Sequence, residues 1–92
     1  MPWKSRATLE NHFRRHGAEV GARTAADYQR LAEFVIRYGV QFTFERTGRP
    51  RIGYSLPRRR HFVVMDDEGM TVSLSRRSEN HVRSLARSTY SG

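Results

Sequence analysis

The sequence predicts an α+β domain in which two N-terminal helices pack on one face of a four- to five-stranded antiparallel sheet. Hydrophobic residues recur at three- and four-residue spacing as far as about residue 38, which indicates helices. From residue 40 onwards they alternate with polar residues, which indicates strands. Turn-forming sequences separate the alternating segments, so an antiparallel meander is the simplest topology. A chain of 92 residues is expected to form a single domain, residues 1–92.

Two helices are expected in the N-terminal part of the chain. Thr8 suits the N-cap of the first helix, and Gly17 is expected to end it because glycine readily adopts the left-handed conformation. Thr24 suits the N-cap of the second helix, which is expected to end near residues 37–39. The buried face of the second helix is predicted from the spacing of Tyr28, Leu31, Ala32, Val35 and Ile36.

Four strands are predicted beyond the helices, at about residues 40–45, 52–56, 61–65 and 70–75. In the last strand the hydroxyls of Thr71, Ser73 and Ser75 are expected on one face, opposite to the apolar side chains. The final segment, residues 78–92, fits a helix capped by Ser78, a fifth strand or a frayed tail.

The chain is strongly basic, with 17 Lys and Arg against 9 Asp and Glu and a formal net charge of +8. Lys4 is the only lysine, so the surplus is almost entirely arginine. Guanidinium groups bind phosphates bidentately and stack on bases, which favours a nucleic-acid partner. A GC-rich genome would explain part of the preference for arginine, but it does not explain the surplus of positive charge.

Several classes of protein are excluded or disfavoured by composition. The chain has no cysteine, which excludes disulfides and thiolate zinc sites. No apolar run approaches the ~20 residues that cross a bilayer, and the N-terminus lacks the apolar segment of a secretory signal. The glycines are scattered, so neither a phosphate-binding glycine loop nor the nucleophile elbow of a Ser/His/Asp hydrolase is expected.

His12 and His16 are the main candidates for catalysis. Residues four apart share a face of a helix, so both imidazoles can act on one site. Histidine takes up and releases protons near neutral pH, which suits it to deprotonate one oxygen and protonate another. Two alternatives remain open: an ordinary polar helix face, and a metal site that takes further ligands such as His61 or Asp66.

Other polar residues are candidates for holding RNA. Arg58, Arg59 and Arg60 precede His61 at a strand entrance, where they form either a phosphate clamp or a solvated surface. Tyr54 can stack on a base, although alternating spacing also fits a core residue. The hydroxyls of Thr71 and Ser73 can bind a phosphate oxygen or face water, and Arg76 extends the basic surface.

Two segments resemble a known family. The segments "LENHFRRHGAEVGARTAADYQRLAEFV" and "HFVVMDDEGMTVSLSRR" are similar to the C-terminal ribonuclease toxin domains of bacterial polymorphic and contact-dependent inhibition toxins, in the barnase, EndoU, colicin and RelE-like superfamily. The similarity covers about the first 36 residues and residues 61–77. Its motifs are a histidine-rich opening helix "H-F-x-[KR]-H-G", then "T-x-x-x-Y-x-x-x-A", and a later strand and turn that lead into a strand with Thr or Ser.

The resemblance implies a fold with helices on one face of an antiparallel sheet and metal-independent cleavage of RNA, often tRNA, without a cofactor. It implies catalytic roles for His12 and His16, a basic residue at Arg15, and a role for Thr71 or Ser73. It also leads us to expect an acidic immunity or antitoxin protein as partner, and action in the cytoplasm of a target bacterium after delivery within a larger secreted protein.

Two other functions fit the same basic surface. One is a non-catalytic nucleic-acid-binding module, in which arginines grip phosphates and tyrosines stack on bases. The other is a metal-dependent nuclease that uses His12, His16 and one acidic residue. The charge does not distinguish these from a metal-independent ribonuclease.

Overall fold

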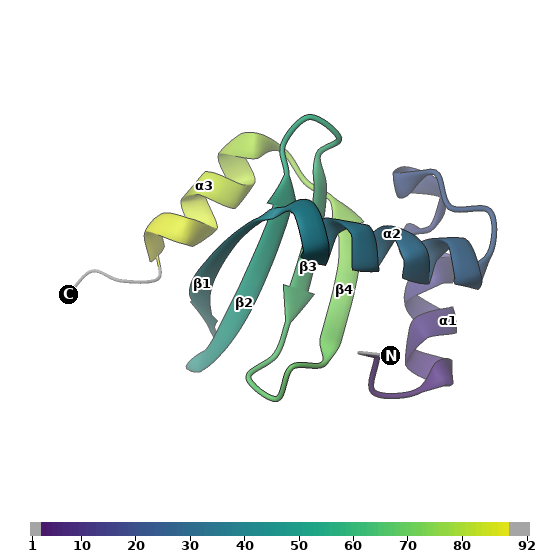
Figure 1. Cartoon of the computed structure of the whole chain (residues 1–92). Coiled ribbons are helices and arrows are strands. Elements are labelled where there is room, and N and C mark those ends of the chain that lie inside the picture. Colours follow the sequence, from purple (N-terminus) through teal and green to yellow (C-terminus); the bar gives the residue numbers. More distant parts are fainter. Residues whose placement is uncertain (1–2, 89–92) are drawn as a thin grey trace.

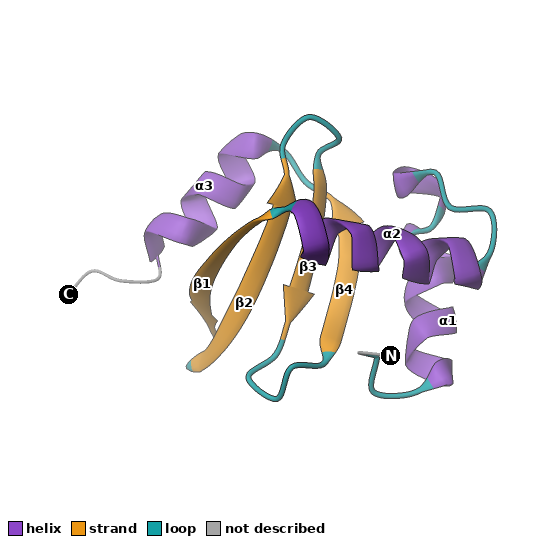
Figure 2. Ribbon diagram, in the orientation of Figure 1, coloured by secondary structure: helices purple, strands orange, loops and turns teal. Residues whose placement is uncertain are grey.

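The computed structural model describes residues 3–88 and confirms the α+β prediction. Its elements are α1 (Arg6–His16), the 3-10 helix η1 (Ala18–Val20), α2 (Ala25–Tyr38), β1 (Val40–Arg46), β2 (Arg49–Leu56), β3 (His61–Met65), β4 (Thr71–Arg76) and α3 (Glu79–Ser88). The strands form one antiparallel sheet in the order β1-β2-β3-β4 (Figure 1). Of the three possibilities for the last segment, the helix is correct (Figure 2). Residues 89–92 of that segment lie outside the described residues.

The helix boundaries follow from capping. The predicted N-cap at Thr8 is wrong, because Ser5 is the N-cap and its hydroxyl accepts a hydrogen bond from the Thr8 N–H at 3.1 Å. Gly17 ends α1 as predicted, but not in the left-handed conformation: its φ is −55°, and the chain continues into η1 before Gly21 turns it at φ 80°. Thr24 caps α2 as predicted, since its hydroxyl accepts from the Asp27 N–H at 3.1 Å.

The sheet carries a hydrophobic core on each face. On one face α1 and α2 pack over β3 and β4, and the buried side chains include Leu9, Tyr28, Val35, Val63 and Leu74. Figure 1 shows α2 crossing in front of the strands and α1 lying beside β4. On the other face α3 covers a cluster of aromatic and aliphatic side chains: Phe44, Phe62 and Val64, with Val82 and Leu85 from the helix.

A β-bulge in the β3–β4 pairing changes which side chains share a face. The register shifts between Val64 and Met65, so Met65 pairs with Thr71 while Val64 pairs with Ser73. Met65 packs on the α1/α2 side and Val64 on the α3 side. Thr71 and Ser73 therefore lie on opposite faces, which corrects the expectation that they share one.

Tyr28 joins α2 to the outer edge of the sheet. Its ring is fully buried, and its hydroxyl donates to the Leu74 carbonyl and accepts from the Leu74 N–H at 3.1 Å. Burial raises the pKa of the Tyr28 hydroxyl to about 12, which keeps the hydroxyl neutral. Within residues 3–88, no helix has both the length and the apolar character needed to span a membrane.

Candidate functional site

His12 and His16 lie side by side on α1. Their ring centroids are 6.1 Å apart and their planes are inclined by 18°, so the imidazoles are stacked one helical turn apart. Both side chains are half-buried. The prediction that they share a face is confirmed, and the two rings are close enough to act on neighbouring atoms of one substrate.

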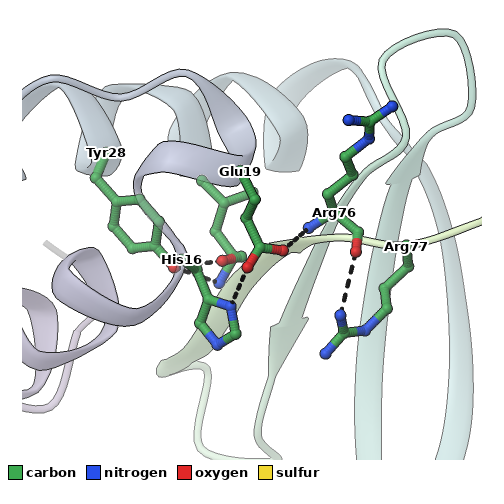
Figure 3. Close-up of polar contacts among 6 residues, drawn as sticks. His16, Glu19, Tyr28, Arg76 and Arg77 are labelled. Atoms are coloured by element: carbon green, nitrogen blue, oxygen red, sulfur yellow. Dashed lines mark hydrogen bonds and ion pairs between the residues drawn. The ribbon is translucent and has the colours of Figure 1, made fainter.

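A carboxylate that sequence reasoning did not select holds His16 in place. Glu19 Oε1 lies 2.7 Å from His16 Nδ1, and Glu19 Oε2 accepts a hydrogen bond from the Arg76 N–H at 2.8 Å (Figure 3). With Nδ1 bound to the carboxylate, Nε2 is the nitrogen of His16 that is left to meet a substrate. The available signal was a glutamate three residues after the histidine. It was missed because no helical turn was expected between Gly17 and Thr24, where η1 carries Glu19.

The protonation of Glu19 reflects opposing effects. Burial alone raises the pKa of its carboxyl. The hydrogen bonds from the Arg76 N–H and from His16, together with the charges of His16 and Arg77, outweigh burial and lower the pKa overall. Glu19 therefore stays ionised, and the carboxylate can stabilise a protonated His16.

His12 has a different environment. Burial, and then the positive charges of Arg15 and His16, lower the pKa of its imidazole. Its Nδ1 is buried and, within the described chain, has no hydrogen-bond partner. The ring of Trp3 packs against it with centroids 5.9 Å apart. The neutral form of His12 thus persists to lower pH than in an ordinary histidine, which suits a proton acceptor.

Basic residues surround the segment that holds the histidines. Arg15 is exposed on α1 and is near enough to lower the pKa of His12. Arg76 ends β4, and its backbone N–H binds Glu19 while its guanidinium points away from His16 (Figure 3). Arg77 follows directly, and its charge acts on Glu19. The Arg77 N–H donates to the Arg60 carbonyl at 2.8 Å, so the arginine-rich turn between β2 and β3 lies against the same end of β4.

His61 lies beside this end of the sheet. It is buried, with 9% of its surface exposed, and it pairs with Arg76 across the β3–β4 ladder. Burial, and then the charges of Arg59 and Arg76, lower the pKa of its imidazole. The position agrees with a supporting role behind the arginines better than with direct contact to an RNA chain.

The turn arginines differ in what they contact. Arg58, Arg59 and Arg60 are all exposed, as a phosphate clamp requires. Arg59 lies over the ring of Phe34, 5.0 Å from its centroid, whereas Arg60 adopts a positive φ of 59°. The exposed turn is thus compatible with binding a phosphate backbone.

Three predicted residues are not placed to act with the histidines. Thr71 is 1% exposed, so its hydroxyl is not accessible to a substrate. Ser73 pairs with Val64 and therefore lies on the α3 face, across the sheet from α1 and α2. Tyr54 is half-buried and packs against the core on the α1/α2 side.

The metal-dependent alternative finds no ligand set in the part of the chain that the structure describes. No group of three or more His, Asp or Glu side chains there is arranged to hold a metal ion. The carboxylate of Glu19 already binds His16 Nδ1 and the Arg76 N–H.

No protein-family model matches the chain, and comparison with curated proteins and with solved structures yields no significant match. The geometry of the site therefore carries the functional argument by itself.

Proposed function

We propose that the protein is a metal-independent endoribonuclease that acts as a bacterial toxin, with His12 and His16 as its acid/base pair and tRNA as its expected class of substrate. The observation that carries the proposal is the stacked His12–His16 pair, in which the two imidazoles have different environments. Pairs of titratable groups held in different environments are typical of acid/base catalysis.

The proposed reaction needs only groups that the chain supplies. Neutral His12 takes the proton of the ribose 2′-OH, and the 2′ oxygen attacks the phosphorus. The bond from phosphorus to the 5′ oxygen breaks, and His16, protonated on Nε2 and held by Glu19, gives its proton to that oxygen. Arg15, whose charge already acts on His12, stabilises the negative charge that develops on the phosphate oxygens. The products are a 2′,3′-cyclic phosphate and a 5′-hydroxyl.

The test is cleavage of total RNA by the purified full chain with and without EDTA, followed by analysis of the product ends. We expect equal cleavage in both and cyclic phosphate ends. His12→Ala and His16→Ala should each lower the rate of cleavage at least about 100-fold. Asn11→Ala, an exposed change on the same helix, is the matched control. Undiminished cleavage by both histidine variants would exclude this mechanism, and activity lost in EDTA and restored by a divalent ion would indicate the metal-dependent alternative.

A non-catalytic nucleic-acid-binding module is the second candidate. It is favoured by the exposed arginines that gather at one end of the sheet, Arg58, Arg59, Arg60, Arg76 and Arg77, because these would grip a phosphate backbone without any need for the histidines. Binding of RNA with steep salt dependence and no product formation would select this function.

A toxin of this kind needs a neutralising partner in the cell that makes it. We expect an acidic immunity or antitoxin protein that covers the basic surface, since charge complementarity speeds association. The toxin would act in the cytoplasm of a target bacterium after delivery as part of a larger protein. The expectation of such a partner would be contradicted if affinity purification from a producing host recovered no small acidic protein.

A further inference from the structure

A pocket with polar side chains lies on the face of the sheet opposite to α1 and α2. It has a volume of about 130 Å³ and is formed between α3 and the sheet. Phe62 and Val64 of β3 supply its apolar floor, and Leu85 of α3 supplies a wall. The β3–β4 register places Ser75 opposite Phe62 and Ser73 opposite Val64, which directs both serines to this side.

The polar groups around the pocket suit an anion. Arg46 from the end of β1, Arg77 from the end of β4 and His81 from α3 line it together with the two serines. None of the described residues that line it is acidic. Among residues 3–88, neither Arg46 nor Arg77 forms an ion pair with a carboxylate, so both guanidinium groups keep their charge available.

The backbone and side chain of Arg77 are held in position. Its N–H donates to the Arg60 carbonyl at 2.8 Å, and its Nη1 donates to the Arg76 carbonyl at 3.1 Å. A guanidinium that is already held loses little conformational freedom when it binds a ligand. Arginine forks and serine hydroxyls together match the several acceptor oxygens of a phosphate group.

We propose that this pocket binds a phosphate group, and that in the cell this is a backbone phosphate of the RNA strand. The assignment of the phosphate to RNA rests on the proposed function, whereas binding of a phosphate group by the pocket does not. Arg77 connects the two sites, because it lines the pocket and directly follows Arg76, whose N–H binds Glu19. One strand that passes the end of β4 can thus place one phosphate at the histidines and another in the pocket.

Two binding measurements on the full chain test the proposal. The first is an NMR titration with inorganic phosphate, in which the backbone amides of Ser73, Ser75 and His81 should shift. The second is the dissociation constant of a short 2′-O-methyl oligonucleotide, which cannot be cleaved, over a range of salt concentrations. Arg46→Gln and Arg77→Gln should each weaken binding at least about fivefold and reduce the slope against salt by about 0.7.

The control is Arg23→Gln, which removes an exposed charge outside the pocket and should change the affinity less than about twofold. If phosphate shifts the pocket amides but both pocket variants bind RNA like the wild type, the pocket serves a small phosphate compound and the RNA assignment is overturned. If phosphate shifts no pocket amide and RNA affinity is unchanged in both folded variants, the whole proposal is overturned. Because the oligonucleotide cannot react, these outcomes are separate from a failure of the protein to cleave RNA.

Discussion

His16 Nδ1 and Glu19 Oε1 lie 2.7 Å apart, across the junction between α1 and η1. The second oxygen of the same carboxylate binds a backbone N–H of β4. The imidazole of His16 is therefore fixed relative to the sheet as well as to its own helix. This relationship makes Glu19 the positioning residue of the proposed active site.

Glu19→Gln should lower the rate of RNA cleavage by roughly 10- to 100-fold, because an amide holds the imidazole without stabilising its protonated form. Single-turnover rates on a defined RNA measure the effect. Glu10→Gln is the matched control on α1, since Glu10 forms an exposed ion pair with Arg6 at 3.2 Å. If Glu19→Gln cleaves RNA at the same rate as the control, Glu19 does not position His16 for catalysis.

The lowered pKa of His12 predicts the pH dependence of activity. A general base works in its deprotonated form, so kcat/KM should rise with pH on an acidic limb that lies below the ordinary histidine value of about 6.5. NMR titration of the imidazole should give the same midpoint. Arg15→Gln should move both midpoints upward because it removes a positive charge near His12, whereas Arg14→Gln should move them less. A His12 midpoint above 6.5 in the wild type would contradict the assignment.

His12 and His61 should also make the fold sensitive to acid. Both have a lower pKa in the folded chain than in the unfolded chain, so the unfolded state takes up protons first as the pH falls. The free energy of unfolding should therefore decrease as the pH falls below about 6.5 and level off below the folded values. Urea denaturation at pH 7.5 and pH 5.5 measures the difference, which His61→Gln should reduce. An unchanged difference in that variant would show that His61 does not contribute.

Tyr28→Phe should destabilise the fold by about 1–3 kcal/mol, because it leaves the buried N–H and carbonyl of Leu74 without their hydroxyl partner. Urea denaturation at neutral pH measures the loss. Tyr38→Phe is the control: this ring is 59% exposed, and its change should cost less than about 0.5 kcal/mol. Equal stability of the two variants would contradict the role of the Tyr28 hydroxyl.

Local patterns were sufficient to predict most of the architecture. Thr24 and Asp27 mark the start of α2 within a few residues, and alternation marks the strands, because both signals depend on near neighbours in the chain. The start of α1 was misplaced because Ser5 and Thr8 are both good N-cap residues. The folded chain uses Ser5, whose hydroxyl accepts a hydrogen bond from the Thr8 N–H.

The site was less predictable because it depends on pairing between distant segments. The bulge at Val64 and Met65 separates Thr71 from Ser73, and no local signal in β4 indicates it. The hydrogen bond between Glu19 and the Arg76 N–H spans 57 positions in the sequence. The stacked histidines were predictable because one helix holds both.

The outward side of β4 is occupied near its start, in its middle and at its end. Trp3 forms a bridge with Thr71 at its start, the Tyr28 hydroxyl takes the outward groups of Leu74, and Glu19 takes the N–H of Arg76 at its end. An edge strand with free backbone groups invites strands from other molecules to join the sheet. Here the residues that organise the candidate site also block such association, so a substitution at Glu19 or Tyr28 is expected to promote aggregation through β4.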